Sequence, residues 1–540
     1  MLGWAVPDAY AQRYADAPPL SRSVSADTIL RADANVLAPG DGIAIVVDAR
    51  NARDMNGTRA RAPGPNSFAT GGNALAAGAD SIALGPQAWA AGDASLAAGV
   101  AAAAHHADAV AIGAGAKAKG EQSMAAGTQA LAASSGSTAV GVQSSATGAA
   151  STALGADAAA FGDGSIALGS GASANEFDSI ALGTAASAFA DETVAIGGAA
   201  SAEGTGSIAL GAEASALDDG SLAAGHGANA QASGGVAIGV AADASAEHGI
   251  AVGANASANG ANGAAIGAAS RAAGADSAAF GIDASALGDA SLAMGRRAIA
   301  TSDGNVAIGA DAHATASSGI AIGVGAHAEG ADSTVLGAGA RVGGTGGVAV
   351  GVAATATGND GLATGARAQA AGFRSTAIGA DATAVGDRST SVGNGASATA
   401  AHSIALGSDA VASGTNSVAL GRASVADRDD TVSVGAAGRE RKIAHVADGV
   451  LPSDAVNMRQ LHSVARRAYG GVAAATALSM IPDVDTGKTI AVGIGTGGYL
   501  GYQAVALGAS VRFGENLKLR AGASLNAATT TWGAGASYSW

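Results

Sequence analysis

A five-residue phrase recurs along most of this chain, with copies at Ser81-Ile82-Ala83-Leu84-Gly85, Ser165-Ile166-Ala167-Leu168-Gly169 and Ser403-Ile404-Ala405-Leu406-Gly407. The glycine that ends the phrase recurs every fourteen residues from Gly71 to Gly435, and no insertion breaks this ladder. A fixed short period is typical of a solenoid, in which each repeat packs only against its neighbours. Fourteen residues are too few for two helices with their turns, so each rung is predicted to consist of short strands.

Large and small residues alternate within the phrase, so the two faces of each predicted strand differ. In one copy Ile180 and Leu182 share a face, and Ala181 lies on the other. We expect the large side chains to fill the interior of the coil and the alanines to face outward. The alanine column changes only at Val335, Ser391 and Ser433. An apolar stripe on a thin coil would be exposed, so the pattern predicts lateral association with further copies of the chain.

Many rungs contain a second glycine about midway between two glycines of the ladder. These residues are Gly92, Gly120, Gly148, Gly162, Gly204, Gly274, Gly330 and Gly386. The coil must turn back at this point, and a positive φ is least costly for glycine. We therefore expect positive φ angles at the midway glycines.

The composition excludes several classes of protein. Of the 540 residues 84 are glycine and only 3% are aromatic, which favours a repeat architecture over a conventional globular core. The net charge of −15 argues against nucleic acid as a partner. The absence of cysteine excludes disulfide bonds and thiolate metal sites. No apolar segment is long enough to predict a transmembrane helix.

The first part of the chain lacks the repeated phrase. Ala9-Tyr10-Ala11 is typical of a signal-peptidase site, and we interpret residues 1–11 as the remnant of a signal peptide. Residues 12–66 are predicted to form either a cap over the edge of the first rung or a ligand-binding tip. Within them only Ile43-Ala44-Ile45-Val46-Val47 has the pattern of a strand.

Beyond the repeats, which we assign to residues 67–437, the chain becomes charged over residues 438–461. Pro452-Ser453-Asp454 predicts the N-terminal cap of a helix, and a short coiled-coil helix is expected over residues 462–482. Its seam follows 3-4-3-4-3 spacing with small residues near its end, namely Leu461, Val464, Ala468, Gly471, Ala475 and Leu478. Pro482 is expected to end the helix.

Within residues 483–540, which we assign to a membrane anchor, residues 489–540 alternate strictly and predict four strands that are apolar on one face and small or polar on the other, as in outer-membrane proteins. The predicted outer face includes Ile490, Val492, Ile494, Val505, Leu507, Val511, Phe513 and Trp532. Lys518 and Arg520 are on the inner face, where they either contact a helix bundle or line a solvated pore. Four strands cannot close a barrel. Two copies would supply eight strands, but three copies would supply twelve with room for helices inside, which fits better.

Several segments resemble the YadA-like family of trimeric autotransporter adhesins. The repeated phrases resemble its head, residues 468–540 up to Trp540 resemble its membrane anchor, and the segment between them resembles its neck. The neck-like motifs are Glu440-Arg441-Lys442-Ile443, Val446-Ala447-Asp448-Gly449 and Asp454-Ala455-Val456-Asn457 followed by Gln460-Leu461, with Ser453 where threonine is commoner.

The resemblance implies a mainly β protein, with a left-handed parallel β-roll as a homotrimeric head, a short neck and coiled coil, and a twelve-stranded trimeric barrel. It implies export of the head through that barrel in the outer membrane of a Gram-negative bacterium. Binding to host surfaces or to matrix proteins such as collagen, fibronectin or laminin, serum resistance and self-aggregation are the implied activities. The chain departs from the family in its almost absent stalk and its long head.

No residues form a pattern typical of catalysis, and we expect neither an enzyme nor a cofactor. His105-His106 could bind a metal ion, but no carboxylate cluster lies nearby in the sequence, so ordinary surface histidines are favoured. The Gly-x-Gly-x-x-Gly motif at Gly493–Gly498 lies in a predicted strand without a following helix, which excludes a dinucleotide site. Arg271 and Arg296-Arg297 are basic spots that could touch acidic glycans, although a solvated surface is the default.

The sequence therefore predicts a surface adhesin whose ligand residues are unknown. The expected partners are two further copies of the chain, the outer-membrane lipid, the barrel-assembly machinery and an unidentified host surface or matrix protein. A passive coat or self-association spacer is the alternative, and an ice-templating solenoid would need a regular row of threonines that the turns lack.

Overall fold

The computed structural model describes residues 43–45 and 60–540. The chain divides into two compact units, one ending at Ala437 and the other spanning Gly438–Trp540. The first unit is a parallel β-solenoid, and the second combines one helix with an antiparallel sheet.

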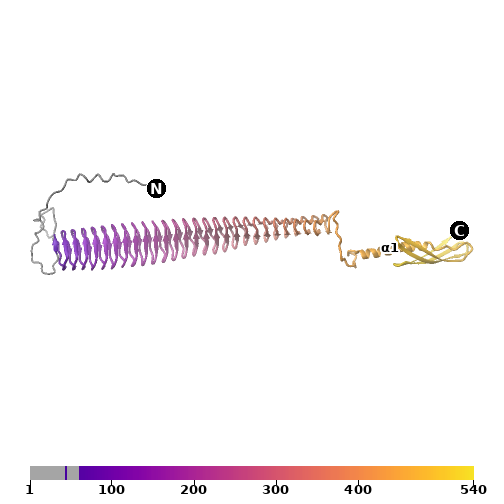
Figure 1. The fold of residues 1–540 in the computed structure, drawn as a ribbon, viewed down its shortest axis with the longest axis horizontal. Coiled ribbons are helices and arrows are strands. Elements are labelled where there is room, and N and C mark those ends of the chain that lie inside the picture. Colours follow the sequence, from indigo (N-terminus) through magenta and orange to yellow (C-terminus); the bar gives the residue numbers. More distant parts are fainter. Residues whose placement is uncertain (1–42, 46–59) are drawn as a thin grey trace, which may run out of the picture. The chain divides into compact units, whose positions relative to one another are not determined.

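Each coil of the solenoid contributes one strand to each of two parallel sheets, and the coils are stacked along one axis (Figure 1). The first sheet contains β2 (Phe68–Thr70), β4 (Ile82–Leu84) and the further even-numbered strands up to β54 (Val432–Ser433). The second sheet contains β3 (Leu75–Ala76) and the further odd-numbered strands up to β53 (Val425–Ala426). Every pairing between coils, from β2 to β54, joins residues fourteen apart, as in Phe68 with Ile82, so the predicted solenoid of short strands is confirmed.

The first coil has a neighbour from the N-terminal part of the chain. Strand β1 (Ile43–Ile45) pairs in parallel with β2, with Ile43 opposite Phe68. The strand predicted over residues 43–47 is therefore present over Ile43–Ile45, and residues 46–47 lie outside the described residues. Its pairing covers the backbone edge that the first coil would otherwise expose.

The assignment of the two strand faces was wrong. Alanines such as Ala83, Ala167 and Ala181 are completely buried inside the coil, whereas Ile82 and Leu182 on the alternate face remain 39% and 38% exposed. Of the three exceptions, Val335 and Ser391 are also fully buried, and Ser433 in the last coil is half-buried. The alanine column is therefore invariant because it fills the interior of each coil.

Alanines fill the interior of each coil because the coil is narrow. Each fourteen-residue coil has a three-residue and a two-residue strand with a turn between them, so the two sheets lie close together. Methyl groups from both sheets fill this space, and a serine before many strands of the first sheet completes it. The Ser81 hydroxyl, for example, donates a 2.6 Å hydrogen bond to the Gly78 carbonyl. Leucine and isoleucine are too large for this interior and point outward.

The turns place a positive φ at every seventh residue, and many of these residues are not glycine. Asn73, Asp80 and Gln87 have φ angles of 59°, 56° and 60°. The ladder glycines from Gly71 to Gly421 also have positive φ, and a Cβ at Gly85 would collide with the backbone of Gly99.

The expected positive φ at the midway glycines is wrong, because none of them has one. They allow close approach of neighbouring coils instead. A Cβ at Gly92 would collide with the carbonyl of His106, and a Cβ at Gly148 with that of Gly162.

The second unit contains α1 (Met458–Ser479), β55 (Ile490–Tyr499), β56 (Tyr502–Phe513), β57 (Leu517–Leu525) and β58 (Thr530–Tyr538). The strands form one antiparallel sheet in sequence order, which confirms the four predicted strands. Their outer face is apolar and exposed, as at Val492 and Ile494. The inner face is lined by glycine and contacts α1: a Cβ at Gly495 would collide with the carbonyl of Ala477.

Helix α1 begins later than the predicted cap. Its N-cap is Asn457, which forms a capping box with Gln460, rather than Ser453 or Asp454. The Asp454 carboxylate instead accepts hydrogen bonds of 2.8 Å from the N–H groups of Val450 and Leu451. Among the described residues there is no helix with the length and apolarity needed to cross a membrane.

Candidate functional surfaces

The first sheet of the solenoid presents a continuous column of large apolar side chains to its surroundings. Each three-residue strand points its first and third residues outward, because its central residue is buried. Exposed members of this column include Ile82, Ile112, Ile166, Leu182, Ile250, Ile266, Leu336, Ile404 and Leu420. Monomeric soluble proteins seldom expose contiguous apolar patches of this extent. The surface available for the predicted lateral association is therefore this apolar column, on the opposite face of the strand from the alanines.

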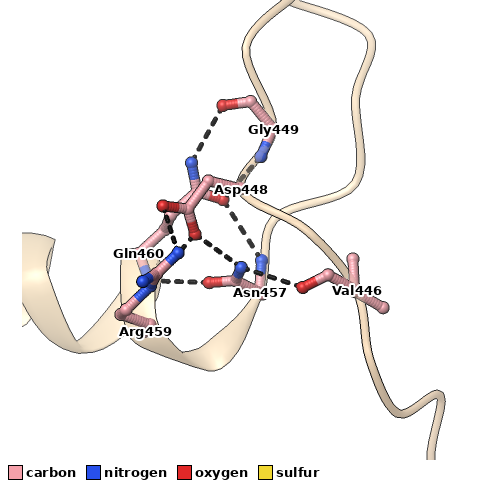
Figure 2. Close-up of polar contacts among 6 residues, drawn as sticks. All are labelled: Val446, Asp448, Gly449, Asn457, Arg459 and Gln460. Carbon is pink, nitrogen blue, oxygen red and sulfur yellow. Dashed lines mark hydrogen bonds and ion pairs between the residues drawn. The ribbon is translucent and has the colours of Figure 1, made fainter.

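The chain that follows the solenoid is fastened to the first turn of α1 by a polar network (Figure 2). The Asn457 side-chain amide donates hydrogen bonds to the Val446 carbonyl at 3.1 Å and to the Asp448 carboxylate at 2.6 Å. Arg459 forms an ion pair with the same carboxylate, with Nη2 and Oδ2 2.5 Å apart. This arrangement connects two segments about ten residues apart in the sequence.

Gln460 completes the network. Its side-chain oxygen accepts hydrogen bonds from the N–H groups of Gly449 and Asn457, and its side-chain amide donates to the Gly449 carbonyl at 2.9 Å. The Asn457-x-x-Gln460 pattern is a capping-box signal that was present in the sequence, but the preceding Ser453-Asp454 pair competed with it. These contacts explain the neck-like motif Asp454-Ala455-Val456-Asn457 followed by Gln460: its last two polar residues cap α1 and hold the preceding segment against the helix.

Replacing Asn457 with alanine should destabilise the start of α1 by about 1 kcal/mol, because the helix loses its cap. The helical circular dichroism signal of the full chain should melt at a lower temperature. The matched control is Ser453→Ala, which removes the cap that the sequence predicted and should leave the melting temperature unchanged. Equal effects of the two substitutions would contradict the assigned cap.

The neck network should also weaken in acid. Hydrogen bonds from Arg459 and Asn457 hold the pKa of Asp448 below its ordinary value of 3.8. A carboxyl group whose pKa is lowered by folding stabilises the folded state above its unfolded pKa, and this contribution is lost as the pH falls through the folded pKa. Pepsin should therefore cleave residues 446–460 of the unsubstituted chain more slowly than those of Asp448→Asn at mildly acidic pH, and the two rates should converge at the most acidic pH. A constant ratio of the two rates would contradict this prediction.

The inner face of the anchor sheet holds α1 through glycines and one arginine. Gly470, Ala473, Ala474 and Ala477 are the buried residues of the helix. The Arg520 guanidinium donates hydrogen bonds to the carbonyls of Leu478 and Ser479 at 2.9 and 3.1 Å, and also to that of Ile481. Lys518 pairs with Asp483 at 3.0 Å. Of the two interpretations, contact with the helix is supported for Arg520, whereas Lys518 contacts Asp483 in the segment after α1.

Two parts of this unit, the edges of the sheet and the exposed side of α1, are not covered within one chain. Strands β55 and β58 are the edges of the four-stranded sheet, so each pairs on one side only. The first part of the predicted coiled-coil seam of α1 is exposed, with Leu461 and Val464 at 52% and 54%, whereas Leu478 at its end packs against the sheet. Both the sheet edges and the helix seam are thus available to further copies of the chain.

The other residues singled out in the sequence do not form a reactive site. His105 stacks edge-on against Trp89, with ring centroids 4.9 Å apart, and burial lowers its pKa. Among residues 60–540 no three His, Asp or Glu side chains gather as a metal site would require. Arg297 forms two hydrogen bonds with Asp311, so this basic spot is largely neutralised. The glycine motif lies within strand β55.

Family models match nearly the whole described chain. The YadA head domain repeat matches in successive copies from residue 56 to residue 437, the coiled stalk of trimeric autotransporter adhesins matches residues 442–479, and the YadA-like membrane anchor domain matches residues 482–540. The chain belongs to the YadA-like trimeric autotransporter adhesins. The anchor places a YadA-like adhesin in the outer membrane with its head repeats at the cell surface.

A solved structure is also similar to part of this YadA-like chain. The crystal structure of the collagen-binding domain of the Yersinia adhesin YadA is 32% identical, covers 30% of this chain and 82% of that chain, and has a TM-score of 0.25. YadA-like adhesins form trimers. The family and the solenoid fold both point to a non-enzymatic protein.

Proposed function

We propose that this chain is a self-exported adhesin of a Gram-negative bacterium, which attaches the cell to host surfaces or matrix proteins. In this proposal residues 67–437 form the head, 438–461 the neck, 462–482 the lumen helix and 483–540 the anchor. The observation that supports it most directly is the occurrence, in one chain and in this order, of head repeats, stalk and membrane anchor.

The proposed assembly is a homotrimer. An open sheet edge is not tolerated in lipid, because its N–H and C=O groups would lack partners. Three copies of the four-stranded sheet would pair β55 of one copy with β58 of the next, and three copies of α1 would fill the lumen along their exposed seams. The apolar column of the first sheet would be covered by the neighbouring heads. Insertion of such strands would require the barrel-assembly machinery.

Surface display of the full chain in a bacterium without adhesins of its own tests this function. Cells should attach to immobilised collagen, fibronectin or laminin, and deletion of residues 468–540 should abolish both attachment and display of the head. Aggregation of the cells without attachment to any matrix protein would favour a passive coat or self-association spacer. A head that stays on intact cells after the deletion would contradict the assigned anchor.

A further inference from the structure

One edge of the solenoid combines exposed aromatic rings with a dense run of carboxylates. It is formed by the turns that follow the odd-numbered strands β15 (Ala159–Ala160) to β23 (Ser215–Ala216). We call it the acidic aromatic edge, and its residues are Phe161, Asp163, Glu176, Phe177, Asp178, Phe189, Asp191, Glu192, Glu203, Asp218 and Asp219. All of them are exposed. Three of the seven phenylalanines of the chain thus lie on three successive coils.

The phenylalanines of this edge have no role in the fold. Phe161, Phe177 and Phe189 are 49%, 53% and 45% exposed; the positions equivalent to Phe161 and Phe189 vary freely in other coils, as at Thr147, Leu217 and Ser245, and those next to Phe177 in the column are Asp163 and Asp191. Exposed phenylalanine adds nothing to the interior, which alanines fill. Clusters of exposed aromatic residues are typical of surfaces that bind a partner.

The charged residues around these rings are all acidic. Between Lys119 and Arg271 the sequence contains no lysine or arginine, while aspartate and glutamate recur throughout. The carboxylates are held in position by the turns: Asp163, Asp191 and Asp219 each accept a hydrogen bond from a backbone N–H one coil earlier, at 2.7, 3.1 and 2.8 Å. A fixed negative surface of this kind attracts positively charged groups.

Another phenylalanine, Phe373, lies in an equivalent turn elsewhere in the solenoid. Its neighbours indicate which groups pack against a ring at this position. Phe373 occupies the turn position of Phe177, and its N–H donates to Asp387 as that of Phe177 donates to Asp191. The guanidinium groups of Arg374 and Arg388 lie 4.9 and 5.9 Å from the Phe373 ring centre.

At Phe177 the two positions equivalent to these arginines are acidic. They are Asp178 and Glu192, and the Phe177 ring is 53% exposed compared with 37% for Phe373. The ring of Phe177 therefore lacks its own cation and is surrounded by groups that would hold one. Arginine is suited to such a place, because its planar group both stacks on a ring and forms paired hydrogen bonds with a carboxylate.

We propose that the acidic aromatic edge binds an arginine-rich segment of a partner polypeptide. The edge spans about four coil steps, or roughly 20 Å, which matches about six residues of extended chain. The guanidinium groups stack on Phe161, Phe177 and Phe189 and pair with the carboxylates between them. This inference names a ligand class for the proposed adhesin head and in that respect rests on the proposed function.

Fluorescence anisotropy of a labelled hexa-arginine peptide with the full chain in detergent tests the proposal. Hexa-arginine should bind more tightly than hexalysine, and its affinity should fall as the salt concentration rises. The triple variant Phe161→Ser, Phe177→Ser, Phe189→Ser should bind hexa-arginine at least about tenfold more weakly. The matched control is Phe373→Ser, which removes the equivalent ring beside Arg374 and Arg388 and should bind like the unsubstituted chain.

Equal affinities of the triple variant and the unsubstituted chain would overturn the proposal, since charge alone would then explain the binding. A smaller oligomer mass of the triple variant than of the unsubstituted chain in unboiled detergent extracts would also overturn it, because the edge would then be a contact between copies of this chain. The result of the hexa-arginine experiment can be distinguished from the result of the adhesion experiment. Cells that attach to matrix proteins but do not bind hexa-arginine would retain the proposed function and exclude this ligand.

Discussion

Replacing Ala167 with phenylalanine should unfold the coils around it and not merely loosen contacts between copies. Ala167 is completely buried and lies between Ala153 and Ala181 of the adjoining coils. Overpacking a filled interior typically costs about 1–3 kcal/mol. We expect at least about 3 kcal/mol here, because the two sheets cannot separate without breaking the parallel pairing above and below. Hydrogen exchange of residues 153–181 in the full chain should accelerate strongly.

Two sets of controls separate this effect from assembly. Ala167→Ser and Ala167→Val should be tolerated, because Ser391 and Val335 occupy the same column in other coils. Ile166→Phe introduces the same ring at the adjacent position, which is 38% exposed. That variant should keep its hydrogen-exchange protection while the association of copies changes. If Ile166→Phe lost as much protection as Ala167→Phe, the alanine column would not be the interior.

The period of the repeat determined most of the solenoid before the structure. A fourteen-residue spacing without insertions permits only in-register stacking, and the observed pairs such as Ala153 with Ala167 follow from it. Alternation likewise predicted the four anchor strands and their outer faces, because a sheet with one apolar face has a single arrangement in lipid.

Alternation could not determine which face of a solenoid strand is buried. It separates Ile180 and Leu182 from Ala181 but contains no measure of the space inside the coil. We assumed that the larger residues are inside, as in most proteins. The distance between the two sheets determines which side chains fit inside the coil. That distance depends on turns that reverse the chain after strands of only two or three residues.

The turns and the helix start were missed for a related reason. Positive φ falls on residues such as Asn73, Asp80 and Gln87, because the hydrogen bonding of each turn fixes its conformation regardless of glycine. At the helix, Asp454 and Asn457 are both suitable caps, and Gln460 selects Asn457 by completing the box.

The acidic aromatic edge could likewise be predicted only in part from the sequence. Its lack of lysine and arginine was visible in the sequence, but the grouping of Phe161, Phe177 and Phe189 needed the coil geometry. Phe177 lies in a turn, whereas the other two follow strands, so no single sequence period connects the three.

Replacing Gly495 with valine should abolish display of the head on the cell surface. The inner face of β55 lies directly against α1, and a Cβ at Gly495 would collide with the carbonyl of Ala477. Its neighbours Gly493 and Gly497 are equally close to Pro482 and to the carbonyl of Ala473, so the helix has no space into which it could shift along the strand. In a trimer the clash occurs three times, and each copy must overcome it for the barrel to close.

The matched control is Thr496→Val, which introduces the same side chain at the next position, on the exposed face of β55. Both variants have valine in the strand and gain hydrophobicity, and any gain in strand propensity favours Gly495→Val, so a loss in that variant is due to the direction of the side chain. We expect the control to yield a heat-resistant trimer in unboiled detergent extracts and a protease-accessible head on intact cells, and Gly495→Val to yield neither. Normal display of Gly495→Val would mean that α1 does not lie against this strand in the membrane. The glycines of the sheet would then have to be explained by contacts with the helices of the other two copies.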